Sequence, residues 1–250
     1  MLTPHQITDF QQNGFLVLPQ LASSTFCAEV LTFAQQYMLA ATPPLEYEAE
    51  TGYPGAPASQ DEPGGKTVRR LLQVAMRSKQ LLDWATGPTL AAPLKQLLGN
   101  KILLSQTHHN CIMTKQPRFS SVTGWHRDSR YWSFQRAELI SAWLALRDET
   151  VENGCLLVIP GSHQIKIDSE GLDVAQFLRM DYPANQALLA RAVAVPLNAG
   201  DVLLFSSNLF HAAGRNQTDQ TKFSMVFTYH AKSNPPITGS RSASLSEIAI

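Results

Sequence analysis

The fold of this chain is decided by a stretch that reads ELISAWLALRDETVENGCLLVI and spans residues 138–159. Two apolar runs, Glu138–Leu146 and Leu156–Ile159, flank a polar segment that contains Asn153-Gly154. Short apolar runs bounded by Asn, Asp and Gly are typical of strands joined by turns. We therefore expect two strands of one β-structure here.

The same pattern extends to both sides of this stretch, from residue 101 to about residue 231. Short strands at such spacing indicate a sandwich or jelly roll. A short helical segment at about Asp173–Phe177 interrupts them, and the polar residues Ser233–Ile250 are expected to form an extended tail. The further predicted strands are Ile102–Thr107, Asn110–Lys115, Ala192–Pro196, Asp201–Phe205 and Phe223–His230.

The first hundred residues are expected to be mostly helical. Thr3-Pro4 predicts a helix start, because it combines a capping residue with proline in the first turn, and Gly14 predicts the end of that helix. The other predicted elements are a strand at Phe15–Pro19, a helix capped by Ser23 or Ser24 that runs to about Ala40, and helical structure from Lys79 to Leu98 that Gly99 ends.

Residues 42–66 differ in composition from the helices on either side. Five prolines and four glycines fall in this segment, together with several acidic residues. We predict a long loop, and long loops inside compact domains are either functional lids or disordered segments. The sequence leaves both alternatives open.

Composition excludes several classes of protein. Of the 250 residues, 44% are hydrophobic and 16% are charged, which is enough apolar material for a large core and too little charge for a disordered chain. Lys+Arg and Asp+Glu are both 20, so the net charge of zero disfavours electrostatic binding of nucleic acid. We expect one domain over residues 1–250, with a mostly helical part (1–100), a jelly-roll core (101–231) and a polar tail (232–250).

The cysteines and the N-terminus point to a cytoplasmic protein. Cys27, Cys111 and Cys155 are odd in number and far apart, which favours reduced structural residues over a disulfide framework or a zinc site. The first residues lack the basic and apolar regions of a signal peptide. No apolar run approaches the length of a transmembrane segment.

A candidate metal site begins with His126 and Asp128. Residues two apart on an extended segment project to the same side, so both side chains can reach one ion. His211, which follows the apolar run Leu203–Phe205, can complete the set. Two histidines and one carboxylate form the facial triad of non-haem Fe(II) oxygenases, which leaves coordination positions open, whereas four ligands close a structural zinc site. The motif H-x-D is short and also occurs by chance.

Longer motifs surround these residues in a fixed order. They are HRDSRYWSF (126–134), LISAWLAL (139–146), ENGCLLVIPGSH (152–163) and AGDVLLF (199–205), the last leading to His211 and Asn216. Near the N-terminus stand Leu2-Thr3-Pro4 and Gly14-Phe15. In these motifs, over most of residues 1–231, the chain resembles the phytanoyl-CoA dioxygenase family.

This resemblance implies a mainly β fold with flanking helices and a double-stranded β-helix core, that is, a cupin-like jelly roll. It also implies that Fe(II), 2-oxoglutarate and O₂ take part in the reaction. His126, Asp128 and His211 match the iron ligands of the family. Trp143 matches an aromatic position of the 2-oxoglutarate pocket, and we expect Asn110 to contact the same co-substrate.

The chain departs from the family at the position that binds the far carboxylate of 2-oxoglutarate. The family usually has an arginine eleven residues after the distal histidine, and this chain has Lys222 there. A lysine neutralises a carboxylate as a point charge but lacks the two-pronged contact of arginine. Arg215, in the turn after His211, is the competing candidate. Ala213 stands where the family often has a small hydroxyl residue.

Basic residues are concentrated near the predicted iron ligands, which suggests an anionic substrate. Alternatively, the arginines form surface pairs with Glu138, Asp148 and Glu149. Of the adjacent His108 and His109, at most one faces the interior. One anion that the family suggests is Kdo, the acidic sugar of lipopolysaccharide. The residues assigned to the substrate are Arg118, Arg127, Arg130 and His109, with Lys115 nearby.

The leading hypothesis is a dioxygenase that hydroxylates a C–H bond of a small, anionic molecule. One alternative is a metal-binding cupin-like isomerase or sensing module without oxygenase activity. Another is a structural or carbohydrate-binding sandwich, which has no need for two histidines and an aspartate around one point. Neither nucleic acid nor a transmembrane segment is expected; a lipid substrate would require contact with a membrane surface, and the oligomeric state stays open.

Overall fold

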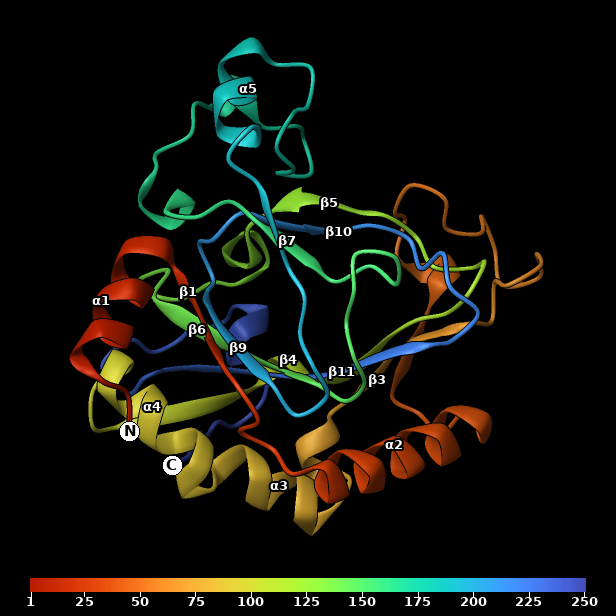
Figure 1. The fold of residues 1–250 in the computed structure, drawn as a ribbon, viewed down its shortest axis with the longest axis horizontal. Coiled ribbons are helices and arrows are strands. Elements are labelled where there is room, and N and C mark those ends of the chain that lie inside the picture. Colours follow the sequence, from red (N-terminus) through yellow and green to blue (C-terminus); the bar gives the residue numbers. More distant parts are fainter.

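The computed structural model describes the whole chain, Met1–Ile250. Two antiparallel sheets face each other (Figure 1): an eight-stranded sheet in the order β1-β9-β6-β11-β4-β3-β2, with β12 beside β4, and a four-stranded sheet in the order β5-β10-β7-β8. Trp143 and Leu203 of the large sheet share one apolar cluster with Leu156 and Ala213 of the small sheet. This is the predicted jelly roll with flanking helices.

The strands fall in these positions along the chain. They are β1 (Phe15–Leu18), β2 (Leu45–Tyr47), β3 (Val68–Leu72), β4 (Ile102–Lys115), β5 (Thr123–His126), β6 (Leu139–Ala145), β7 (Leu156–Val158), β8 (Val193–Val195), β9 (Val202–Ser206), β10 (His211–Ala213), β11 (Lys222–Ala231) and β12 (Ile248–Ala249). The α-helices are α1 (Pro4–Asn13), α2 (Ser24–Leu39), α3 (Lys79–Thr86), α4 (Pro88–Leu98) and α5 (Pro183–Leu189).

Side chains alternate along β11, so its two faces contact different parts of the molecule. Phe223, Met225 and Phe227 join the larger apolar core, which α2, α3 and α4 cover (Figure 1). Lys222 and Val226 face the other way, toward the small sheet. Because side chains alternate along a strand, one strand both anchors the helices and supplies polar groups between the sheets.

The helix signals in the sequence are confirmed. Thr3 caps α1 with a reciprocal capping box, and Gly14 ends it at a positive φ of 81°. Ser23 caps α2 through a hydrogen bond from the Phe26 N–H. The predicted helical segment 79–98 is two helices, because α3 ends at Gly87 and α4 begins with Pro88.

Most predicted strands are present, with two differences. The segments 102–107 and 110–115 form the single strand β4, with an irregularity opposite Phe227 and Thr228. The strands β2, β3, β5, β10 and β12 are present in addition to the predicted ones. β1, β2 and β3 extend the large sheet, so the first hundred residues share that sheet with the predicted core.

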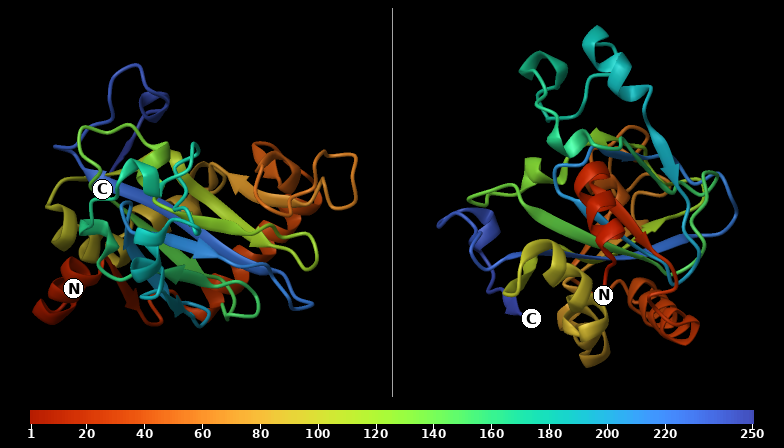
Figure 2. Two further views of the ribbon diagram at one scale, coloured as in Figure 1. Left: turned by 90° about the horizontal axis from the view of Figure 1, so that it is seen from above. Right: turned by 60° about the vertical axis from the view of Figure 1, so that its left-hand side comes forward.

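The helical prediction for Asp173–Phe177 is wrong. The Asp173 carboxylate accepts hydrogen bonds from the Ala175 and Phe177 N–H groups, both at 2.9 Å, and Gln176 has a φ of 63°. Aspartate forms such local bonds in competition with a helix. The helix of this region is α5, which lies on a segment that projects from the two sheets (Figures 1 and 2).

The prediction of an extended C-terminal tail is also wrong. β12 pairs with β4, and Ile248 packs against the large core. Ser242 is buried, and its Oγ lies 2.7 Å from His108 Nε2 and accepts a hydrogen bond from the Ser133 N–H at 2.8 Å. The apolar residues at the very end of the chain thus return it to the sheet.

Residues 42–66 contain more regular structure than predicted. β2 pairs with β3, and a 3₁₀ turn follows at Glu48–Glu50. Glu48 is fully buried and forms a 3.0 Å ion pair with Arg69, which connects this segment to β3.

Cys27, Cys111 and Cys155 are buried and free. No helix of the chain has both the length and the apolar character needed to cross a membrane.

Candidate active site

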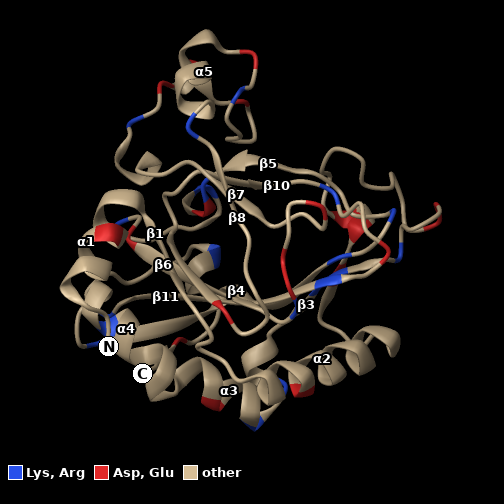
Figure 3. Ribbon diagram, viewed as in Figure 1, with Lys and Arg blue, Asp and Glu red and all other residues tan.

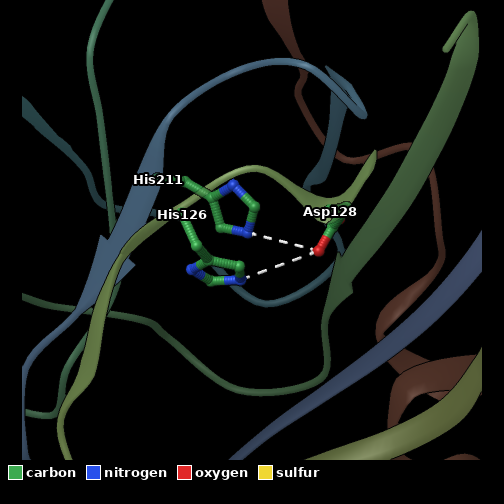
Figure 4. Close-up of side chains that lie close together, drawn as sticks. All are labelled: His126, Asp128 and His211. Carbon is green, nitrogen blue, oxygen red and sulfur yellow. Dashed lines mark ion pairs between the residues drawn. The ribbon is translucent and has the colours of Figure 1, made fainter. Parts of the chain in front are cut away.

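The short strands β5 and β10 place two histidines side by side. His126 ends β5, His211 begins β10, and the two residues are direct partners in the antiparallel register. Asp128 begins the 3₁₀ turn Asp128–Tyr131 immediately after β5. Its Oδ1 lies 3.7 Å from the Nε2 of each histidine (Figure 4). Neighbouring strands and the turn that follows therefore bring the three predicted ligands to one point.

Backbone carbonyls fix the orientation of both imidazoles. His126 Nδ1 lies 2.8 Å from the carbonyl oxygen of Gly124, and His211 Nδ1 lies 3.0 Å from that of Leu209. Because a carbonyl oxygen only accepts, each Nδ1 carries a proton, so Nε2 is the ring atom that each histidine can offer to a metal. Burial lowers the pKa of His126 well below 6.5, so this ring is neutral, as metal binding requires.

The environment of Asp128 favours its ionised form. Burial by itself raises the pKa of this carboxyl group, but the nearby His109, His211 and His126 outweigh burial, and the pKa lies below 3.8. The second carboxylate oxygen lies 3.5 Å from both Ser141 Oγ and His109 Nδ1. These contacts orient the carboxylate while Oδ1 points to the histidines.

This donor set fits Fe(II). All three side chains are buried, and their ligand atoms lie within 4.8 Å of one another. No fourth potential ligand completes the group, as a structural zinc site requires. Two imidazole nitrogens and one carboxylate oxygen on one side of an ion leave positions open for a chelating co-substrate and O₂.

The triad opens onto a cavity of about 610 Å³ between the two sheets. The small sheet contributes the histidines, Thr123, Leu156 and Ala213, and the large sheet contributes residues of β3, β4, β6 and β11. Charged residues lie on the segments around β3 and also on the α5 region, α1, α2 and α3 (Figure 3). The size of the cavity and its position between the two sheets are typical of small-molecule sites.

Away from the triad, the cavity has a basic end built on Lys222 and Lys115. Lys222 Nζ donates to Glu149 Oε2 at 2.9 Å, and it lies 5.0 Å from the centre of the Trp143 ring. Trp143 Nε1 donates to the other oxygen of Glu149 at 2.8 Å. Lys115 is the direct partner of Lys222 across β4 and β11, and its Nζ donates to the Ser121 carbonyl at 2.9 Å.

Comparison with known proteins identifies this arrangement. The family model described as phytanoyl-CoA dioxygenase matches residues 10–224. This chain belongs to the phytanoyl-CoA dioxygenase family. Together, the family and the triad make it an Fe(II)- and 2-oxoglutarate-dependent dioxygenase that uses O₂.

Curated relatives cover most of the chain at low identity. An ectoine dioxygenase from Bordetella bronchiseptica is 24% identical over 253 aligned positions, which cover 93% of this chain and 77% of the relative. The human peroxisomal phytanoyl-CoA dioxygenase is 25% identical, over 87% of this chain and 65% of its own length. The crystal structure of EctD from S. alaskensis with 2-oxoglutarate and 5-hydroxyectoine has a TM-score of 0.79 at 22% identity, over 94% of this chain and 78% of that one, and thus the same fold.

Several predicted site residues line the cavity of this family member. Trp143, Lys222 and Asn110 do so on the large sheet, and His109 and Arg130 do so close to Asp128. Asn110 Oδ1 accepts a hydrogen bond from the Ala75 N–H at 2.8 Å, while its buried Nδ2 has no partner. An unsatisfied buried donor beside a cavity is available to a ligand.

Three other predicted residues do not line the cavity. Arg118 and Arg215 are exposed, and the Arg215 guanidinium lies against Gly55 at the surface. Arg127 turns away from the triad, because its Nη2 donates to the Ser162 and Ile165 carbonyls and its guanidinium covers the Phe210 ring at 4.3 Å. Their closeness to iron ligands in the sequence does not bring their side chains to the site.

The alternative that these arginines form surface pairs with acids is not what the structure shows. Glu138 pairs with Arg136, Glu149 is buried against Lys222, and Asp148 accepts a hydrogen bond from the Ala199 N–H. The cavity also has walls that the sequence did not reveal. They come from β3 (Arg69 and Arg70), the 42–66 segment (Glu46, Glu50 and Tyr53) and the C-terminal segment (Arg241 and Leu245).

Proposed function

We propose that the protein hydroxylates a C–H bond of a small anionic substrate. The observation that carries this proposal is the buried His126, Asp128 and His211 triad beside a cavity that is also lined by Arg130 and Arg241, two cations without an acidic partner. When bound, Fe(II) couples the decarboxylation of 2-oxoglutarate to succinate and CO₂ with insertion of one oxygen atom of O₂ into the C–H bond.

The large sheet supplies the co-substrate pocket. Lys222 is the cation for the far carboxylate, since it occupies the family position and lines the cavity, whereas Arg215 is exposed. Trp143 forms a wall of this pocket beside the Lys222 ammonium. Asn110 offers its free Nδ2 donor to the same ligand.

The opposite side of the cavity supplies the substrate site. The Arg130 guanidinium lies over the Phe177 ring at 3.6 Å, and its partners are the Ala175 carbonyl and the Tyr131 hydroxyl. Arg130 and Arg241 both line the cavity, and neither has a carboxylate within 4.0 Å that would neutralise its charge. His109 also lines the cavity, and its Nδ1 lies 3.5 Å from Asp128 Oδ2.

A contact over the mouth supports a lid function for residues 42–66. The hydroxyls of Tyr53 and Tyr131 lie 3.0 Å apart, and Tyr53 packs edge-on against Phe177. These contacts join the 42–66 segment to the turn that carries Asp128. A closed cover excludes water from the reacting groups while the substrate is bound.

Succinate formation from 2-oxoglutarate tests this proposal. Candidate carboxylic and phosphorylated acids are compared with their neutral amides or esters. Kdo is one acid of this panel, because no contact in the cavity singles it out. We expect iron-dependent succinate formation that an acid stimulates and its neutral counterpart does not, and Arg130→Met should remove that preference. Equal stimulation by neutral counterparts would contradict an anionic substrate. Stable 2-oxoglutarate with every compound would favour the isomerase or sensing module.

A further inference from the structure

The basic end of the cavity holds two buried lysines and one carboxylate. Lys115 and Lys222 have 5% and 3% of their surface exposed, and they face each other across neighbouring strands. Side chains of directly opposed residues lie on the same face of a sheet, here the cavity side. Glu149 is fully buried and forms its ion pair with Lys222 alone.

The other buried or half-buried cations in this region are already paired. Arg69 Nη1 lies 3.0 Å from Glu48 Oε1, and Arg70 Nη1 lies 3.3 Å from Glu46 Oε2. Lys115 has no carboxylate within 4.0 Å, and its hydrogen bond goes to the Ser121 backbone carbonyl. Lys115 is therefore the buried amine at this end of the cavity that has no charged partner.

An unpaired buried ammonium is costly. Burial is the main cause that lowers the pKa of Lys115 well below 10.5, and the charges of Arg69 and Lys222 add to it. A dianionic ligand that places one carboxylate between the two lysines supplies the missing charge. The free energy lost by burying Lys115 is then recovered only when such a ligand binds.

We infer that Lys115 is a second cation of the 2-oxoglutarate site, and that Lys115 and Lys222 together hold the far carboxylate in place of one arginine. This inference rests on the proposed function. A single lysine donates to one carboxylate oxygen as a point charge, and Lys222 already shares its ammonium with Glu149. A second ammonium from the adjacent strand restores a two-pronged contact, one side chain to each oxygen.

The same arrangement selects against ligands without the far carboxylate. A 2-oxo acid of equal length that ends in a methyl group would leave Lys115 unpaired and would place apolar atoms beside two amines. We therefore expect Lys115 to contribute to affinity for 2-oxoglutarate and to contribute nothing to affinity for 2-oxopentanoate, which retains the chelating 2-oxo acid end.

Calorimetric titration of the Fe(II)-loaded protein without O₂ tests this inference. The ligands are 2-oxoglutarate and 2-oxopentanoate, and the proteins are wild type, Lys115→Met, Lys115→Gln and the exposed control Lys101→Met. We expect Lys115→Met to weaken 2-oxoglutarate by about 10- to 100-fold, the size of a lost charge-assisted hydrogen bond, and to leave 2-oxopentanoate unchanged. Lys101→Met should match wild type for both ligands.

Lys115→Gln keeps a donor for the Ser121 carbonyl but removes the charge, so it separates folding from binding. It should lose 2-oxoglutarate affinity selectively even where Lys115→Met does not fold. Wild-type affinity for 2-oxoglutarate in Lys115→Gln, or an equal loss for both ligands, would overturn the role of Lys115. A wild-type protein that binds neither ligand in the presence of iron would overturn the proposed function itself.

Discussion

The metal end and the lysine end of the cavity use buried charge in different ways. At the metal end, Asp128 is the one carboxylate, and two imidazoles face it at 3.7 Å. At the lysine end, Glu149 is the one carboxylate, and two amines lie near it, of which it pairs with Lys222 at 2.9 Å. The first end is a preformed cation site, and the second retains an amine without a charged partner.

This difference shows what each end requires of its ligand. When both histidines are in the neutral form that binds a metal, they and the aspartate carry a charge of −1, which a divalent cation overcompensates and a chelating anion then balances. Lys115, Lys222 and Glu149 carry +1 when both amines are protonated, which matches one carboxylate. A dicarboxylate that chelates the metal with one end and reaches the lysines with the other satisfies both.

Replacement of the triad should have the largest effect of all. His126→Ala, Asp128→Ala and His211→Ala each remove one of three ligands, and we expect metal affinity to fall by at least about 100-fold and turnover to be abolished. The fold should persist, because none of these residues belongs to the apolar clusters. Metal content and circular dichroism of the purified variants check both statements. Full iron-dependent turnover in any of these three variants would contradict the assignment of the metal ligands.

Replacement of Arg69 tests an ion pair that we expect to stabilise the fold. Arg69→Met leaves the fully buried Glu48 without its partner, and we expect a loss of about 3–5 kcal/mol in the free energy of unfolding. The matched control is Arg70→Met, whose pair with Glu46 is 25% exposed on both sides and should contribute about 1 kcal/mol or less. Urea denaturation measures both. Equal losses would mean that burial does not distinguish the two pairs.

Lys222→Ala should weaken 2-oxoglutarate by about 10- to 100-fold, because a charge-assisted contact is removed. The iron affinity should change much less, since Lys222 does not belong to the triad. Arg215→Ala serves as the control, and its exposed side chain predicts wild-type affinity. The assignment is reversed if Arg215→Ala is the variant that loses 2-oxoglutarate.

The pH dependence of 2-oxoglutarate binding should show the lowered pKa of Lys115. The protonated amine attracts the carboxylate, so affinity should fall as the pH rises through that pKa, which lies well below 10.5. Arg69, Lys222, Glu48 and Glu149 set the local field. Lys115→Arg, which stays charged throughout, should bind with a flatter pH profile. The same pH dependence in both proteins would assign the effect to another group.

The smallest effect is expected at the mouth of the cavity. Residues 42–66 should be cleaved by a protease more slowly when substrate and 2-oxoglutarate are bound, because Tyr53 closes against Tyr131. Tyr53→Phe removes this hydroxyl contact and should increase cleavage severalfold without affecting metal binding. Identical cleavage with and without ligands would show that the segment is not a lid.

The sequence predicts the metal end better than the lysine end, for a physical reason. His126 and Asp128 are two residues apart on one short segment, so the convergence of these two ligands depends on local geometry. His211 joins them through the register of β5 and β10, and it was placed by the family resemblance. The Lys222–Glu149 pair and the facing Lys115 depend on strand register between segments distant in sequence. The sequence alone does not give this strand register, so it does not show which charged side chains lie next to each other.

The same limit explains why two of the predicted substrate residues do not line the cavity. Arg118 and Arg127 are close to the iron ligands in sequence, but one lies on the surface and the other bonds to carbonyls outside the cavity. Arg241 lies more than a hundred residues from Asp128 in sequence and lines the cavity because β12 returns the C-terminal segment to β4. Long helices and strands with clear caps and periodicity were predictable, whereas short pairings that complete the site were not.

The triad and the lysine end act together on 2-oxoglutarate in the reaction that we propose. The most direct measurement is the release of succinate per 2-oxoglutarate consumed under air, with Fe(II), for wild type and Asp128→Ala. We expect one succinate for each 2-oxoglutarate in the wild type, dependence on added iron, and no succinate above background in Asp128→Ala. Succinate at equal rates in both proteins, or none in iron-loaded wild type with any substrate class, would contradict it.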